Sequence, residues 1–221
     1  MPAVEPEIPA ERWELGEQGR VASRALAAAL PQQGYFVASD EPKAIQTVQE
    51  MSAGLEVVPD PGFREVRRPD RWSDDYRAQA RAYVDGECHE GWEPHAEVVA
   101  RFEAAVSRHA RAAAARQQAL IVGTHGLAPT VWLASRLRLV PTTGAFWASL
   151  RFPDLIDVDL RAKRAERQLE SVRRGLRKMY EDTTPGRNLR PSSKLTSEDE
   201  ALLDTLEERD SGRRAICPPW I

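Results

Sequence analysis

Residues 119–123, Ala-Leu-Ile-Val-Gly, form the most strand-like segment of the chain, and Thr124-His125-Gly126 follows it directly. An apolar run without polar alternation predicts a strand that is buried on both faces. Gly126 allows a tight turn, and a helix is predicted from about 129 to 137. This order of strand, turn and helix is typical of an α/β protein, and it would deliver His125 to the edge of the sheet.

The chain before this segment shows the same alternation. Its predicted elements are a helix at 17–30, a strand at 35–39, a helix at 42–51 and a strand at 55–58. The apolar face of the first helix consists of Val21, Ala25, Leu26 and Ala29. Asp40 is predicted to cap the second helix, with Pro42 in its first turn.

Beyond residue 60 the alternation continues. The predicted elements are a loop at 60–72, a helix that Ser73 caps, a loop at 85–93, a helix at 94–116, and strands at 146–151 and 155–160. The helix at 94–116 carries an apolar stripe of Val98, Val99, Phe102 and Val106. Strands that alternate with helices predict a three-layer α/β/α fold with a mainly parallel sheet.

Composition indicates a folded protein of the cytoplasm. Apolar residues make up 42% of the 221 residues and charged residues 29%, as in ordinary globular domains. No apolar run approaches the roughly 20 residues that cross a bilayer, and the start of the chain lacks the features of a signal peptide. Cys88 and Cys217 lie far apart, which predicts reduced thiols and no metal site. The net charge of -3 gives no reason to expect binding to nucleic acid or a membrane.

The composition changes at Arg161. Residues 161–178 hold eight Arg or Lys and two Glu, whereas residues 181–211 are net acidic. We therefore expect an α/β domain over 1–160 and a charged, partly flexible helical tail over 161–221. The basic run could bind nucleic acid or an acidic partner, or it could be a solvated helix that the acidic segment neutralises. The lack of aromatic residues within the run favours the solvated helix.

Polar groups follow three of the predicted strands, at the ends where α/β sheets bind ligands. His125 follows the strand at 119–123. Ser39 and Lys43 lie where the strand at 35–39 meets its helix, a junction that suits an anion. Glu65 lies in the loop after the strand at 55–58. Taken alone, each residue also has an ordinary explanation, as a loop histidine, a solvated lysine or a surface carboxylate. A site is therefore indicated by the order of these residues along the chain and not by any one of them.

That order is similar to the order of motifs in the histidine phosphatase (phosphoglycerate mutase-like) superfamily. The matching segments are Trp13-x-Leu15-x-x-x-Gly19, Ser39-x-x-x-Lys43-Ala44-x-Gln46-Thr47, Glu65, Gly91-Trp92-Glu93 and Thr124-His125-Gly126. The resemblance spans about Trp13 to Leu160. An Arg is usual in the family where Lys43 stands, so this chain keeps the positive charge and gives up bidentate contact with phosphate.

The resemblance implies a phosphomonoester hydrolase that works through a phosphohistidine. In such enzymes the His of an N-terminal Arg-His-Gly motif attacks phosphorus. A second His, matched by His125, holds the phosphoryl oxygens together with a basic residue, matched by Lys43, and with Ser39. An acid, matched by Glu65, protonates the leaving oxygen. The resemblance implies no metal and no cofactor, and the expected ligand is a small phosphorylated substrate or phosphate.

The Arg-His-Gly motif has no counterpart before Trp13. The one Arg-His pair, Arg108-His109, falls on a predicted helix, and neither His89 nor His95 is expected to stand in line with a bound phosphate. The family's first strand lies inside the sheet, and the first ten residues cannot replace it because three of them are proline. Either Met1 is not the true start, which we favour, or the chain is a degenerate relative.

Two functions follow from these observations. The leading one is a histidine phosphatase family protein whose residues 1–221 are inactive or severely impaired, because the nucleophilic His is absent. The alternative is a non-catalytic protein that binds anions or acts as a scaffold on the same fold.

Overall fold

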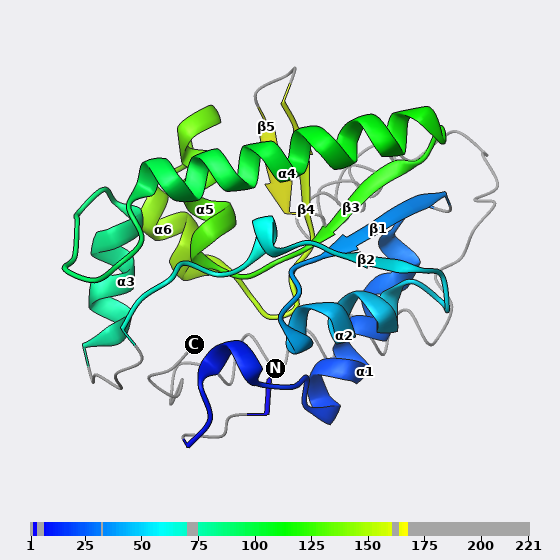
Figure 1. The fold of residues 1–221 in the computed structure, drawn as a ribbon, viewed down its shortest axis with the longest axis horizontal. Coiled ribbons are helices and arrows are strands. Elements are labelled where there is room, and N and C mark those ends of the chain that lie inside the picture. Colours follow the sequence, from blue (N-terminus) through cyan, green and yellow to red (C-terminus); the bar gives the residue numbers. More distant parts are fainter. Residues whose placement is uncertain (1, 4–6, 32, 70–74, 161–163, 168–221) are drawn as a thin grey trace, which may run out of the picture. The chain divides into compact units, whose positions relative to one another are not determined.

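A computed structural model describes residues 2–3, 7–31, 33–69, 75–160 and 164–167, and Figure 1 shows its elements. The chain divides into one unit over Met1–Ser171 and another over Val172–Ile221. The second unit lies outside the described residues, and so does nearly all of the helical tail predicted over 161–221. The fold below is that of the first unit.

A three-stranded parallel sheet lies at the centre of this unit. Its strand order is β2 (Val57–Pro59), β1 (Gly34–Ala38), β3 (Ala119–Gly123). Phe36 lies opposite Val57 on one side and opposite Ile121 on the other. The strands predicted at 35–39, 55–58 and 119–123 are confirmed to within two residues.

Helices cover both faces of the sheet. Phe36, Ala38 and Ile121 pack with Val48 of α2 (Pro42–Met51) on one face. Val37 belongs to the larger core on the other face, which α4 (His95–Ala115) and α5 (Leu127–Arg136) complete. Figure 1 shows α4 on one side of the strands, and α2 with α1 (Glu17–Leu26) on the other. The expected helix–sheet–helix layering is confirmed.

The first helix buries a different face from the predicted one. Helix α1 continues into a 3-10 turn, η2 (Ala27–Ala29), but Val21 of its apolar stripe is 55% exposed. The buried residues are Gly19 and Ser23, and the Ser23 hydroxyl donates to the Gly19 carbonyl at 2.7 Å. Small residues let α1 approach α2 closely, and apolarity alone does not reveal this.

The sequence predicted that Asp40 caps α2, but the residue at the cap position is Glu41. The carboxylate of Asp40 is turned outward and accepts hydrogen bonds from Nε and Nη2 of Arg64 at 2.6 and 2.5 Å. The two neighbouring acidic side chains therefore go to different places. Asp40 joins a surface ion pair, while Glu41 is 6% exposed and lies inside.

The remaining elements differ from the prediction most clearly at 146–151, and also at 164–167, where a strand stands in the segment expected to be helical. They are η1 (Ala10–Arg12), η3 (Pro61–Phe63), α3 (Tyr76–Val84), α6 (Thr143–Ser149), β4 (Ile156–Asp159) and β5 (Arg164–Arg167). The segment predicted as a strand at 146–151 lies mostly in α6. The Thr142 side chain caps this helix by accepting from the Ala145 N–H at 3.1 Å. Its aromatic residues, Phe146 and Trp147, are buried, which accounts for an apolar run that resembles a strand.

Strands β4 and β5 form a separate antiparallel pair, with Ile156 opposite Arg167. Strand β5 follows the change of composition at Arg161. Among the described residues, no strand pairs with the outer edge of β3. The structure also corrects the prediction that β3 is buried on both faces, since only Ile121 of this strand is buried and its other four residues are half-buried.

Candidate functional site

The carboxyl ends of β1 and β3 bring Ser39 and His125 together. The Ser39 N–H donates to the Gly123 carbonyl at 2.8 Å, which continues the pairing of the strands past their ends. The Ser39 hydroxyl is then 2.9 Å from Nε2 of His125. Both side chains are buried. Two residues that are 86 positions apart in the sequence thus form one contact at the edge of the sheet.

Gly126 serves this edge through its small size. Its backbone is helical, with φ −94° and ψ −51°, so the turn after β3 does not require the left-handed conformation. A Cβ atom at this position would lie 3.2 Å from both Nε1 of Trp147 and Cζ of Phe152. The glycine is needed for close packing against these rings rather than for the tight turn that the sequence suggested.

Lys43 reaches the same edge through Glu41. The Lys43 ammonium donates to Oε2 of Glu41 at 2.5 Å and to the Ala10 carbonyl at 2.6 Å. The other oxygen of Glu41, Oε1, lies 3.2 Å from Nε2 of His125 and accepts from the Glu65 N–H at 2.9 Å. Glu41 therefore contacts all three of these residues. We call Ser39, Glu41, Lys43, Glu65 and His125 the rim site.

The Glu65 side chain lies at the N-terminus of α5. Its carboxylate accepts hydrogen bonds from four backbone N–H groups, those of Val66, Gly126, Leu127 and Ala128, at 2.8 to 3.1 Å. The first turn of a helix has free N–H groups and a positive end, so an ionised carboxylate is stabilised there. The loop that follows β2 is fastened in this way to the turn that carries His125.

The electrostatic environment favours the ionised form of Glu65 and the neutral form of His125. Burial alone would raise the pKa of Glu65, but His125 and the backbone N–H groups outweigh this effect and hold it below its ordinary value. These N–H groups act whether or not the imidazole is charged. Burial lowers the pKa of His125, although Glu41 and Glu65 oppose the shift. At neutral pH the rim site therefore contains an ionised Glu65 and a neutral His125.

The contacts of His125 differ from those of a serine-hydrolase triad. Such a triad places the serine on one ring nitrogen and the carboxylate on the other. Here Ser39 and Glu41 both contact Nε2. From this position the carboxylate cannot orient the imidazole for a proton transfer from Ser39.

The chain has four histidines, and the other three are engaged elsewhere. Nε2 of His89 contacts the Gln79 carbonyl at 2.9 Å, and Nε2 of His95 contacts the Tyr83 carbonyl at 2.7 Å. His109 lies in α4 as predicted, with Nε2 at 2.7 Å from Asp60. His125 is thus the histidine of the rim site.

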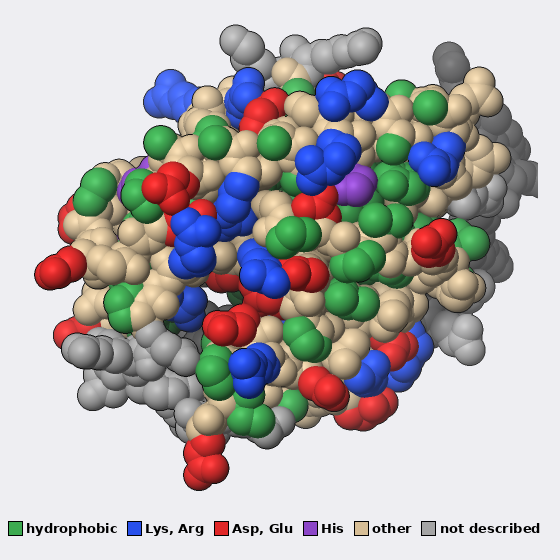
Figure 2. Space-filling view, viewed as in Figure 1, with side chains coloured by type: hydrophobic (Ala, Val, Ile, Leu, Met, Phe, Trp, Pro, Cys, Tyr) green, Lys and Arg blue, Asp and Glu red, His purple; other side chains and the backbone are tan. Residues whose placement is uncertain are grey.

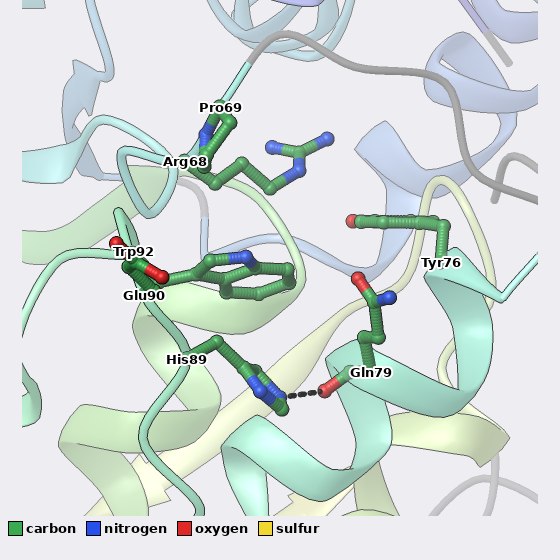
Figure 3. Close-up of a pocket in the computed structure, with 7 residues that line it drawn as sticks. All are labelled: Arg68, Pro69, Tyr76, Gln79, His89, Glu90 and Trp92. Atoms are coloured by element: carbon green, nitrogen blue, oxygen red, sulfur yellow. Dashed lines mark hydrogen bonds between the residues drawn. The ribbon is translucent and has the colours of Figure 1, made fainter.

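A shallow cavity of about 320 Å³ lies beside the loop that carries Glu65. It is lined by Arg68, Pro69, Tyr76, Gln79, His89, Glu90 and Trp92. Figure 3 shows the Trp92 indole between the Arg68–Pro69 segment and His89, with Tyr76 of α3 opposite. The stacked rings of Trp92 and Tyr76 have centroids 6.4 Å apart. The aromatic side chains that line the cavity therefore also pack against one another.

Arg101 of α4 supports the loop that carries Glu65. Its guanidinium makes hydrogen bonds of 2.8 and 2.9 Å to the buried carboxylate of Glu93. It also donates to the carbonyls of Gly62, Arg64 and Glu65 at 2.8 to 3.2 Å. An Arg can satisfy so many acceptors because its donors form a rigid fork.

Comparison with known proteins gives the same fold. A model of the histidine phosphatase superfamily (branch 1) matches residues 10–148. The chain belongs to the histidine phosphatase superfamily. Curated protein sequences give no match.

Solved structures of this superfamily fold are similar at low identity. A structure described as mycobacterial hydrolase 1 is 21% identical, with a TM-score of 0.51, over 70% of this chain and 85% of the other. The complex of mycobacterial glucosyl-3-phosphoglycerate phosphatase with inorganic phosphate is 20% identical, with a TM-score of 0.50, over 70% and 86%. A Thermus thermophilus protein, TTHB049, is 21% identical, with a TM-score of 0.50, over 70% and 84%.

The described residues of this histidine phosphatase family member contain neither a membrane-spanning helix nor a cluster of metal ligands. None of the described helices is long and apolar enough to cross a bilayer. Within the same residues no three His, Cys, Asp or Glu side chains gather as metal ligands would. Figure 2 shows Lys and Arg interspersed with Asp and Glu on the visible face.

Sequence reasoning missed two residues of this region, Glu41 and Arg101. Glu41 stands in the segment from Ser39 to Lys43 that best matches the family, and its position between two predicted site residues was the available signal. Arg101 could not be found in this way, because the three backbone carbonyls to which it donates lie at least 36 residues away.

Proposed function

We propose that the rim site is the phosphoryl-binding half of a phosphomonoester hydrolase of the phosphohistidine type. The observation that carries the proposal is that the Glu41 carboxylate joins Lys43 to His125, whose Nε2 also contacts Ser39 at the edge of the sheet. The ammonium of Lys43 supplies positive charge, and the groups of Ser39 and His125 supply hydrogen bonds to phosphoryl oxygens. The phosphate complex of a structurally similar mycobacterial phosphatase supports this choice of ligand.

The reaction needs a second imidazole. A nucleophilic ring nitrogen attacks phosphorus, the bond to the leaving oxygen breaks, and that oxygen takes up a proton. Water then cleaves the P–N bond, which releases phosphate and restores the imidazole. His125 is the one histidine that the described residues place at the rim site, and its expected role is to hold phosphoryl oxygens. Among those residues no second imidazole is there to attack phosphorus, so residues 1–221 alone should have little or no turnover. A strand that carries an Arg-His pair would find its place along the outer edge of β3.

Glu65 is the residue whose role is hardest to reconcile with its contacts. A general acid must carry a proton before the reaction. The four N–H donors and the lowered pKa favour the ionised carboxylate instead. We therefore propose that Glu65 mainly positions the His125 turn, and that any proton it donates must be taken up while the substrate is bound.

An activity assay tests the proposal. Hydrolysis of p-nitrophenyl phosphate is compared between residues 1–221 and a longer chain with a strand and an Arg-His segment ahead of Trp13. We expect turnover only in the longer chain and its loss in His125→Ala of that chain. Equal activity in the two chains would sink the proposed mechanism.

A non-catalytic anion-binding protein is the second candidate. The observation that favours it is the set of four backbone N–H groups that donate to the Glu65 carboxylate, which favour its ionised form over a proton-carrying acid. Calorimetry with phosphate and vanadate, comparing the wild type with His125→Ala, separates this candidate from a purely structural remnant. Weak binding that the substitution removes supports an anion site, and no difference between the two proteins removes this candidate.

A further inference from the structure

The side chain of Glu41 lies where an anion bound at the rim site would lie. Its two oxygens contact the Lys43 ammonium at 2.5 Å and Nε2 of His125 at 3.2 Å. These are the two groups expected to hold phosphoryl oxygens. A third contact, from the Glu65 N–H to Oε1 at 2.9 Å, completes a set of donors around one carboxylate.

The charges of the rim site match this internal carboxylate. Glu41 and Glu65 are two negative charges, and Lys43 is the positive charge that Glu41 contacts directly. A phosphate dianion bound at the rim site would lie near the carboxylates of Glu41 and Glu65. Glu41 would also compete with it for Lys43 and His125. Like charges a few ångströms apart in a buried site repel strongly. The dianion and the ionised Glu41 therefore exclude each other.

The neighbouring acidic residue shows that this placement is specific. Asp40 also stands at the junction of β1 and α2, yet its carboxylate turns outward to Arg64, whose side chain is 56% exposed. The Glu41 side chain is only 7% exposed and paired inside. A carboxylate that only balanced the charge of Lys43 would not need contact with His125 as well.

We propose that Glu41 is an internal occupant of the anion site and thereby determines its specificity. A phosphoryl group enters only as the Glu41 carboxylate leaves Lys43 and His125, and the phosphoryl oxygens then take over its donors. The affinity of the wild type for phosphate is lowered by the cost of that displacement. This inference depends on the proposed anion site, and it names the residue that decides which ligands the site accepts.

The test uses residues 1–221 and inorganic phosphate. Binding is measured by calorimetry at constant ionic strength for the wild type, Glu41→Gln and Glu41→Ala. The Gln variant removes the charge and keeps the volume, while the Ala variant removes both. We expect each variant to bind phosphate at least about tenfold more tightly than the wild type, because one buried like charge has gone. Asp40→Asn is the matched control, and its affinity should equal that of the wild type.

A double variant locates the bound anion. Lys43→Ala in the Glu41→Gln background should abolish the gain, because phosphate then lacks the ammonium that Glu41 contacts in the wild type. Thermal unfolding gives a second measurement on the same proteins. Phosphate should raise the midpoint of Glu41→Gln more than that of the wild type, since a ligand stabilises the state that binds it.

The outcomes separate the two proposals. If the wild type and both Glu41 variants bind phosphate equally, the anion site stands and the role of Glu41 is overturned. If no variant binds phosphate, the anion site and the role of Glu41 both fail. If Asp40→Asn gains as much as Glu41→Gln, the gain reflects net charge, and the inference is also overturned.

Discussion

Glu65 and Leu127 lie 62 residues apart in the sequence, and the N–H of Leu127 donates to a carboxylate oxygen of Glu65 at 3.1 Å. This contact is one of three that join the Glu65 side chain to the first turn of α5. The carboxylate thus does for α5 what a local capping side chain does for other helices. The position of His125 depends on this long-range cap.

Replacing Glu65 with Gln should lower the free energy of unfolding by about 2–4 kcal/mol. The amide has one acceptor oxygen, so its NH₂ group faces N–H donors that are buried and lose their partner, at about 1–3 kcal/mol each. Urea unfolding measures the change. Glu97→Gln is the control, because its side chain is 58% exposed and should alter stability by less than about 0.5 kcal/mol. An unchanged midpoint in Glu65→Gln would show that the cap adds no stability.

Stability should fall in acid. Burial would raise the pKa of Asp60, Glu65 and Glu93, but hydrogen bonds and positive charges lower all three below their ordinary values. A carboxyl group whose pKa is lower in the folded protein stabilises the fold at a pH above its unfolded pKa. This stabilisation is lost as the pH falls through the folded pKa. The unfolding free energy should begin to decline below about pH 6.5, because burial lowers the pKa of His125 and only the unfolded chain then takes up its proton. It should decline more steeply below about pH 4.5, where the three carboxylates are protonated in the unfolded chain.

The same urea titrations on Glu93→Gln check the assignment. This variant should be less stable at neutral pH, because the partner of Arg101 is lost, and its decline in acid should be shallower. Wild-type stability that stays constant down to about pH 3 would contradict the prediction.

The strands could be predicted because their signals are local. The run at 119–123 is apolar throughout, and the structure places β3 on those residues. His125 and Ser39 were predicted to meet because parallel strands end at the same edge of a sheet, and they lie 2.9 Å apart. Topology alone was enough for this contact.

The failures come from packing and from side-chain direction. Phe146 and Trp147 gave an apolar run without showing that Thr142 would cap a helix there. Asp40 was a better cap by residue type than Glu41, but Arg64 holds it outside. Whether a carboxylate turns inward or outward depends on partners distant in the sequence, so the inward position of Glu41 could not be derived from the sequence.

Replacing Arg101 with Lys should destabilise the protein by about 2–4 kcal/mol, although the positive charge is kept. A lysine ammonium cannot reach the two oxygens of Glu93 and the three carbonyls that the guanidinium reaches, so several buried acceptors lose their donor. Thermal and urea unfolding measure the loss. Arg111→Lys, on the same helix, should be close to neutral. If Arg101→Lys is equally neutral, charge rather than geometry supports the Glu65 loop.

Replacing Trp92 with Ala should remove the wall of the cavity in Figure 3 and cost about 2–4 kcal/mol. The indole lies with its ring centroid 5.0 Å from that of Tyr83 and 5.2 Å from that of His89, so its loss leaves a gap between α3 and the following loop. Urea unfolding and near-ultraviolet circular dichroism report the change. Trp92→Phe keeps an aromatic ring in place and should recover at least half of the lost stability. An Ala variant as stable as the wild type would mean that this aromatic cluster does not hold the loop, and its rings would then be available to contact a ligand.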